Sequence, residues 1–117
     1  AFSRALHLAL EAGRELGKAG ISAEIIDPRT LVPFDYDTLY ESIGKTGRLI
    51  IVHEACKSFG VGGELAARVV EDCFDLLDAP VIRVAGKDTP IPYNPGLEKL
   101  AVPQVADIID AVYRVLG

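Results

Sequence analysis

The fold is decided by the stretch RLIIVHEACKSFGVGGELAARVV, residues 48–70. Its apolar residues 49–52 predict a short strand, the polar residues 53–58 predict a turn, and glycines at 60, 62 and 63 open a predicted helix. Strand, glycine-rich turn and helix in this order form half of a βαβ unit. Because ligands and partners bind at the carboxyl ends of strands in open α/β sheets, this turn is the first place to look for a site.

The segments on either side alternate between helix and strand. Before it we expect a helix over residues 2–18, a strand over 22–26, and a helix from Tyr36 to about Gly44 with Asp35 as its N-cap. The helix of the stretch itself is expected to end near Leu76. After it we expect a strand over 81–85 and a last helix beginning at Val102-Pro103. This alternation predicts an α/β domain with a mainly parallel sheet covered by helices. The first helix has no strand before it, so we expect the first strand to have been removed, to lie in a gap, or to belong upstream of Ala1.

The composition excludes several classes of function. The chain has 117 residues, of which 50% are hydrophobic, and this suggests one domain with a real core. The formal net charge of −5 and the scattered basic residues disfavour nucleic-acid binding, which needs clustered Lys and Arg. No apolar run approaches the roughly 18 residues that a membrane span requires, so we expect none.

The chain begins at Ala1 and contains no Met, so we expect a fragment of a longer protein. Its two cysteines, Cys56 and Cys73, do not resemble a disulfide framework, and we interpret both as reduced thiols of an intracellular protein.

Three residues with chemical potential follow the predicted central strand. His53, Glu54 and Cys56 could act as base, orienting carboxylate and nucleophile. Side chains so close in sequence rarely face one another, however, and no oxyanion donor is identifiable. A structural zinc site would need four ligands, whereas the whole chain has two His and two Cys. We therefore predict no catalytic and no metal-binding residue.

The glycine-rich segment GVGG, residues 60–63, has two possible roles. Backbone N–H groups at a helix start could hold a phosphate. The pattern is neither GxGxxG nor a Walker sequence, so tight packing of the helix on the sheet is the favoured interpretation.

The segment GKDTPIPYNPG, residues 86–96, carries three prolines and cannot form regular structure. Prolines lower the entropy lost when a loop docks, so this loop suits a partner surface, although a simple connector over the end of the sheet is an equal alternative.

Six ordered blocks carry a family resemblance. They are AEIIDPRTLVP (23–33), TGRLIIVHE (46–54), GVGGELA (60–66), LDAPVIRV (77–84), DTPIPY (88–93) and the final helix from Val102-Pro103. Almost the whole chain resembles the C-terminal domain of the transketolase-like family. Within it, the sequence is most similar to the beta subunit of the decarboxylating component of 2-oxoacid dehydrogenase complexes, of the pyruvate, branched-chain or acetoin type.

The resemblance implies a three-layer α/β domain, residues 1–117, that is one part of a longer beta subunit. The parent enzyme would use thiamine diphosphate and magnesium, not bound by this domain alone, to decarboxylate a 2-oxoacid and acylate a lipoyl group. The implied partners are an alpha subunit, a second beta subunit and a dihydrolipoyl acyltransferase. The family would place the protein in the cytoplasm of a bacterium or archaeon, or in the mitochondrial matrix of a eukaryote.

No catalytic residue is carried over onto this chain, and the fragment alone is expected to be inactive. The residues expected at partner interfaces are Glu54, Asp88, Pro90, Pro92, Tyr93 and Gly117. Two alternatives remain: the C-terminal domain of another transketolase-like enzyme, or a stand-alone scaffold that binds an anion or nucleotide at the glycine turn.

Overall fold

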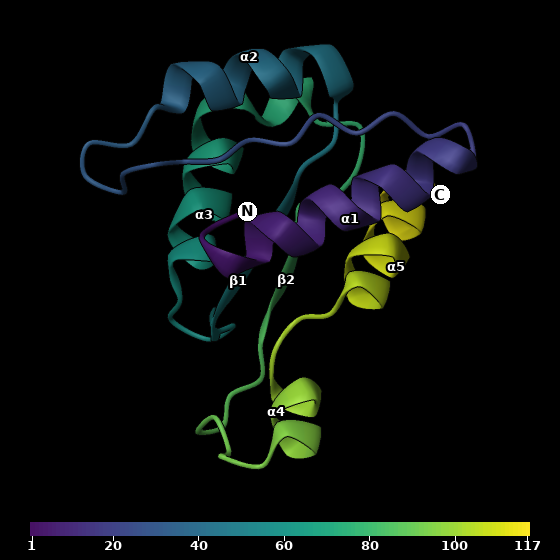
Figure 1. The fold of residues 1–117 in the computed structure, drawn as a ribbon. Coiled ribbons are helices and arrows are strands. Elements are labelled where there is room, and N and C mark those ends of the chain that lie inside the picture. Colours follow the sequence, from purple (N-terminus) through teal and green to yellow (C-terminus); the bar gives the residue numbers. More distant parts are fainter.

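A computed structural model describes residues 1–117 (Figure 1). The elements in chain order are α1 (Arg4–Lys18), α2 (Tyr36–Thr46), β1 (Ile50–Cys56), α3 (Val61–Cys73), the short 3₁₀ helix η1 (Phe74–Leu76), β2 (Ile82–Gly86), α4 (Pro95–Ala101) and α5 (Val105–Leu116). None of these helices is both long enough and apolar enough to cross a bilayer.

The sheet has two parallel strands, β1 and β2, joined through α3. Ile50 is opposite Ile82 and Val52 is opposite Val84, and an irregularity separates these pairs from Cys56 and Gly86. The strand–helix–strand unit expected from residues 48–85 is therefore confirmed.

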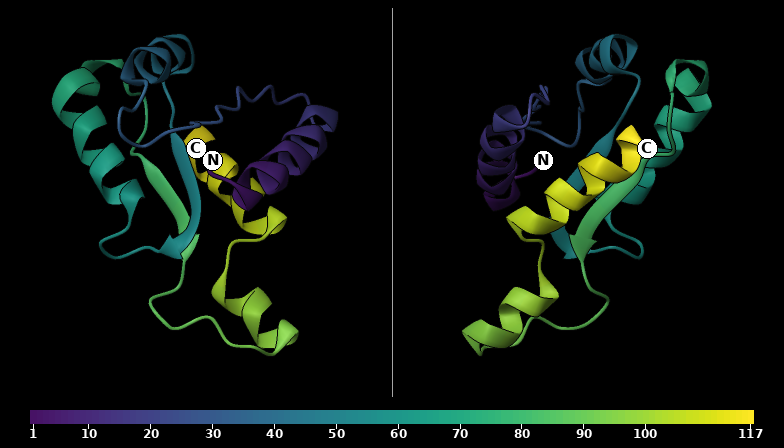
Figure 2. Two further views of the ribbon diagram at one scale, coloured as in Figure 1. Left: turned by 60° about the vertical axis from the view of Figure 1, so that its left-hand side comes forward. Right: turned by 90° about the vertical axis from the view of Figure 1, so that its right-hand side faces the viewer.

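Helices cover both faces of this sheet (Figure 2). On one face, α1 and α5 bury Ala5, Ala9 and Ile108 against Val52. On the other side, α2 and α3 pack together through Leu39, Ile43, Val69 and Cys73. The three-layer α/β architecture is confirmed, although on a smaller sheet than is usual for such a domain.

Residues 53–58 differ from the prediction. They were expected to form a turn, but β1 continues through His53 to Cys56, and the turn into α3 follows it. The prediction ended the strand at its first polar side chain. The strand continues because it remains paired with β2 as far as Gly86, and because the buried His53 has hydrogen-bond partners for both ring nitrogens.

The predicted strand over residues 22–26 is wrong, since this segment has no regular secondary structure. It runs from α1 toward α2 without a strand beside it (Figure 2). A strand requires ladder hydrogen bonds to a neighbour, so apolar β-branched residues alone do not produce one. Further along this connection, the Val32–Pro33 peptide bond is cis.

Several helix ends also differ from the prediction. Helix α2 is capped by Asp35 as predicted but continues past Gly44 to Thr46, where Gly47 adopts a left-handed conformation with φ of 69°. Helix α5 begins at Val105, after Pro103, because the backbone N–H of Gln104 donates to the Asp107 carboxylate at 2.8 Å.

Helix α3 and the segment after it also depart from expectation. The α-helix ends at Cys73, before the predicted end near Leu76, and the apolar side chains of Val70 and Phe74 are exposed. Helix α4 was not predicted, although Asn94 caps it and Pro95 occupies its first position. The expectation that residues 86–96 are irregular throughout is therefore wrong at both ends, since Gly86 belongs to β2 and Pro95 and Gly96 belong to α4.

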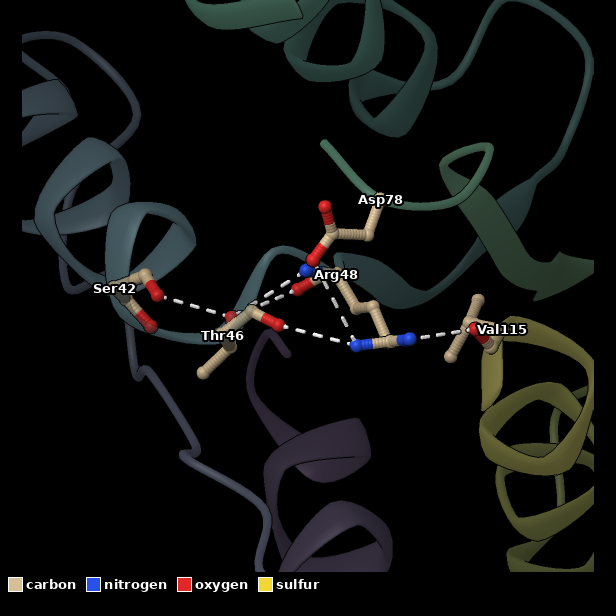
Figure 3. A network of polar contacts seen from close by, with 5 residues as sticks. All are labelled: Ser42, Thr46, Arg48, Asp78 and Val115. Atoms are coloured by element: carbon tan, nitrogen blue, oxygen red, sulfur yellow. Dashed lines mark hydrogen bonds and ion pairs between the residues drawn. The ribbon is translucent and has the colours of Figure 1, made fainter. Parts of the chain in front are cut away.

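A polar cluster holds the amino end of the sheet (Figure 3). The Arg48 guanidinium donates from Nε to the carbonyl of Val115, at 2.8 Å, and lies 4.0 Å from the Asp78 carboxylate. The Thr46 hydroxyl donates to the carbonyl of Ser42 at 3.0 Å. This cluster ties the ends of α2 and α5 to the start of β1.

Candidate functional site

His53 lies on the β1 face that packs against α3, and its side chain is buried. Its Nε2 accepts a hydrogen bond from the Gly62 N–H at 3.3 Å, so its Nδ1 carries the proton and donates to the Ala55 carbonyl at 3.0 Å. Burial lowers the pKa of His53 and favours this neutral form. Nε2 thus joins β1 to the start of α3, and Nδ1 is held within β1 itself.

The glycine turn is shaped by close packing. A Cβ at Gly60 would lie 2.3 Å from the Cys56 carbonyl oxygen, and one at Gly62 would lie 2.6 Å from His53 Nε2. The N–H of Gly63 donates to the Gly60 carbonyl at 3.0 Å. These contacts support the packing interpretation, because two N–H groups that a phosphate would need already have partners.

The structure does not join His53, Glu54 and Cys56 into a nucleophile–base unit. The imidazole is held by two backbone groups, and Cys56 is an exposed free thiol. Cys73 is a buried free thiol in α3, so the prediction of two unpaired cysteines is confirmed.

Glu54 points to the opposite face of β1 from His53, toward α1 and α4. Its Oε1 lies 3.7 Å from Arg4 Nε, and the same guanidinium lies 3.7 Å from the Glu98 carboxylate. That Glu54 oxygen is completely buried and has no hydrogen-bond partner. An unsatisfied carboxylate oxygen is unfavourable, so this position calls for a further donor.

Asp88 joins the loops at the carboxyl ends of the two strands. Its carboxylate accepts from the Ser58 N–H at 3.0 Å and from the Ser58 hydroxyl. These hydrogen bonds hold the pKa of Asp88 below its usual range. Asp88 therefore fixes the start of the proline loop against the turn before α3.

The rest of the proline loop projects from the domain together with α4 (Figures 1 and 2). Pro90 is exposed, Pro92 is half-buried, and the Tyr93 side chain is fully exposed. The base of this projection is closed by the Lys87 N–H, which donates to the Ala101 carbonyl at 2.8 Å.

This projection and the adjacent turn carry a group of large exposed apolar side chains. We call them the apolar tip, and they are Phe59, Ile91, Tyr93, Leu97 and Leu100. Sequence reasoning found only Tyr93, since α4 was not expected. The Asn94-Pro95 capping signal, read with the apolar spacing of Leu97 and Leu100, would have found these two residues of α4.

Gly117 is exposed, with a φ of 89°, and follows α5 at the end of the molecule opposite α4 (Figures 1 and 2). The structure thus brings Glu54, Asp88, Pro90, Pro92 and Tyr93 to one end of the domain. It leaves Gly117 outside that group.

Comparison with known proteins gives a consistent result. Residues 1–108 match the family model described as transketolase, C-terminal domain. The pyruvate dehydrogenase E1 component subunit beta of Rhizobium meliloti is 49% identical over 97% of this chain and 25% of its own length. A mitochondrial subunit beta-1 from Oryza sativa is also 49% identical, over 97% of this chain and 30% of its own.

A solved structure shares the fold. It is described as a split gene transketolase, inactive beta4 tetramer, and it superposes with a TM-score of 0.82 at 27% identity, covering 98% of this chain and 36% of that one. The chain therefore spans only about a quarter to a third of the length of the relatives that it matches.

Proposed function

The chain belongs to the transketolase C-terminal domain family, and we propose that it is the subunit-association domain of a thiamine-diphosphate-dependent 2-oxoacid dehydrogenase beta subunit. The parent enzyme would decarboxylate a 2-oxoacid and acylate a lipoyl group. Its location would be the cytoplasm of a bacterium or archaeon, or the mitochondrial matrix of a eukaryote.

The observation that carries the proposal is the apolar tip. Tyr93 and Phe59 are as exposed as in an extended chain, and Leu100 is 63% exposed. Aromatic and aliphatic side chains gathered on a projection are typical of association surfaces. The partners would be the alpha subunit, a second beta subunit and a dihydrolipoyl acyltransferase.

Glu54 supports the same function. Its buried, unpartnered Oε1 lies near the base of the projection, with Arg4 at 3.7 Å. A donor from a neighbouring subunit or from the preceding domain would satisfy this oxygen. Glu54 is then an interface residue, as the family resemblance implies.

Thiamine diphosphate, with magnesium, would supply the decarboxylation chemistry when bound to the parent enzyme. The residues of this chain do not fit its diphosphate, because the N–H groups of Gly62 and Gly63 already donate to His53 and Gly60. We therefore assign the cofactor ligands to other parts of the enzyme. The same contacts disfavour the alternative of a stand-alone anion-binding or nucleotide-binding scaffold.

Assembly of the parent enzyme tests the proposal. The double substitution Tyr93→Ser with Leu100→Ser in the full beta subunit should shift the complex with the alpha subunit toward free subunits in analytical ultracentrifugation. A matched control is Phe74→Ser, which removes a 64% exposed apolar side chain from η1. Assembly of the double variant as complete as that of the control would contradict the proposal.

Catalysis gives a second test. The 117-residue chain with thiamine diphosphate and magnesium should show no decarboxylation of pyruvate or branched-chain 2-oxoacids, whereas the assembled parent enzyme should turn one of them over. Turnover by the isolated chain would place catalytic residues within it.

A further inference from the structure

The projection, residues 87–101, joins the domain through a single neck (Figures 1 and 2). Its two ends meet where the Lys87 N–H donates to the Ala101 carbonyl at 2.8 Å. None of the residues between them is buried, and Ala101 is the only buried residue of α4. A helix of seven residues is marginally stable at best on its own, so α4 depends on the contacts that hold it at its sides.

Side chains hold the projection from two directions. On one side, the Asp88 carboxylate accepts hydrogen bonds from Ser58, in the turn before α3. On the other side, the Arg4 guanidinium, at the start of α1, places Nη1 3.7 Å from Oε1 of Glu98. No other side chain of α4 makes a polar contact with α1 or β1, so the orientation of α4 depends on Arg4.

Arg4 is shared between two carboxylates and completes a hydrogen bond to neither. Its Nε lies 3.7 Å from Glu54 Oε1, the same distance that separates its Nη1 from the Glu98 carboxylate. Charge-assisted hydrogen bonds are about 2.7–2.9 Å long, so both contacts are long ion pairs. One positive charge thus faces two negative charges, and a movement of about 1 Å toward either carboxylate would complete a hydrogen bond with it.

The two carboxylates differ in how much they need this donor. Glu54 Oε1 is completely buried without a hydrogen-bond partner, which is unfavourable. Glu98 is half-buried and lies in the first turn of α4, where the helix dipole already stabilises a negative charge. Glu54 therefore competes with Glu98 for Arg4, and the position of α4 depends on which of them Arg4 contacts.

We propose that Arg4 is a two-position latch for the projection and that Glu54 is the competitor that opens it. With Arg4 on Glu98, α4 is held against α1; with Arg4 on Glu54, α4 is free to turn on its neck. The consequence for assembly rests on the proposed function. A partner's donor that satisfied Glu54 would return Arg4 to Glu98 and fix the α4 part of the apolar tip, so that binding at Glu54 would strengthen binding at the tip.

The full beta subunit without its alpha subunit tests the latch, because this measurement does not depend on what binds the tip. Amide hydrogen exchange of the peptide covering residues 94–101 is followed by mass spectrometry. Glu98→Gln should speed this exchange by about two- to fivefold, the range expected for loss of an exposed ion pair. Glu54→Gln should slow it by a similar factor, because Arg4 then faces Glu98 as its only anionic partner.

The dependence on Arg4 is tested in the same assay. Arg4→Gln should match Glu98→Gln, and adding Glu54→Gln to Arg4→Gln should have no further effect, because the competition requires the guanidinium. Lys99→Gln is the matched control, since it removes an exposed charge from the same helix without touching Arg4, and it should stay close to wild type.

Two results would overturn the latch. Faster exchange in both Glu54→Gln and Glu98→Gln would make Arg4 a passive bridge that needs both carboxylates, and unchanged exchange in both would remove any role for the ion pairs. Failure of the proposed function has a different signature. Opposite exchange effects of the two variants, together with normal assembly of the double variant Tyr93→Ser with Leu100→Ser, would retain the latch and contradict only the association role of the tip.

Discussion

Two regions of this molecule have similar sequence patterns and different structures. In the paired half, residues 48–86, an apolar segment forms β1 and pairs with β2 through the α3 crossover. In the unpaired half, residues 4–46, helices α1 and α2 form as expected but the apolar segment between them forms no strand. The difference teaches that a helix makes its backbone hydrogen bonds within its own segment, whereas a strand makes them only with a neighbouring strand.

The largest expected effect is a loss of stability. It is tested by comparing two helix glycines, one facing the apolar segment of each half. Gly62→Ala would place a Cβ 2.6 Å from His53 Nε2 and 3.3 Å from Ile51 Cγ2, and the imidazole is held by two hydrogen bonds. We expect a loss of about 1–3 kcal/mol in the free energy of unfolding from overpacking. Gly13→Ala meets only the Cδ1 of Ile25 at 3.1 Å, which is the far end of a flexible side chain, so its cost should be well below that.

Urea unfolding of both variants measures this contrast. Gly63→Ala is the matched control in α3, because its nearest neighbour is Arg83 Nη1 at 3.6 Å, and it should be neutral or slightly stabilising. Equal losses for Gly62→Ala and Gly13→Ala would show that residues 21–26 are as rigidly held as β1.

The second effect is a pH dependence confined to the paired half. The pKa of buried His53 is lowered on folding, so the unfolded chain binds a proton more readily. The stability contributed by neutral His53 is complete above about pH 6.5 and declines as pH falls toward the lower folded pKa. Protonated Nε2 could no longer accept from the Gly62 N–H.

Unfolding free energies measured from pH 7.5 to 5 should therefore decrease, and the decrease should be smaller in His53→Asn. His7→Asn, at an exposed position, is the control and should keep the wild-type slope. The same slope in both variants would remove His53 as the source.

The third effect tests the contact between the halves. The Tyr40 hydroxyl of α2 donates to the Asp72 carboxylate of α3, and burial together with this hydrogen bond raises the pKa of Tyr40 to about 12. Because the pair is partly exposed, Tyr40→Phe should cost only about 0.5–1 kcal/mol.

Amide exchange in α2 and α3 shows where that cost falls. Protection against amide exchange should decrease in both helices if the two halves unfold together. A loss confined to α2 would show that the unpaired half opens independently.

The smallest expected effect is a gain in stability. Gly17 lies inside α1 with nothing within 4 Å of a Cβ, so Gly17→Ala should stabilise the protein by about 0.5–1 kcal/mol. Gly20→Ala is the opposite control, because its φ of 81° suits glycine and a side chain there would be strained.

The midpoint temperature of thermal unfolding should thus rise for Gly17→Ala and fall for Gly20→Ala. If the low local stability of the unpaired half is confined to residues 21–34, stabilising α1 should leave amide exchange at residues 22–26 unchanged.

Particular residues show how far the sequence was sufficient. The helix predicted over residues 2–18 is α1, which buries Ala5, Ala9 and Ala12, and Asp35 predicted the start of α2. Residues 60–63 were correctly interpreted as a packing device. His53 was wrongly placed in a turn, because a polar residue after an apolar run carries no sign that its partners are the Gly62 N–H and the Ala55 carbonyl.

The candidate site divides in the same way. Tyr93 and the proline loop were found from composition, because clustered prolines exclude regular structure. Phe59, Leu97 and Leu100 were not found, since their exposure depends on how the loop and α4 project from the sheet. That Glu54 Oε1 has no hydrogen-bond donor is likewise visible only in three dimensions.

The sequence by itself determined helices α1, α2, α3 and α5 and the central strand–helix–strand unit, because helix hydrogen bonds and apolar periodicity are local. Only the tertiary structure decided that residues 22–26 have no strand partner, that His53 faces Gly62, and that large apolar side chains are exposed on the proline loop, on α4 and on the turn before α3. Each of these depends on atoms contributed by segments distant in sequence, and ladder pairing and burial exist only after those segments have met.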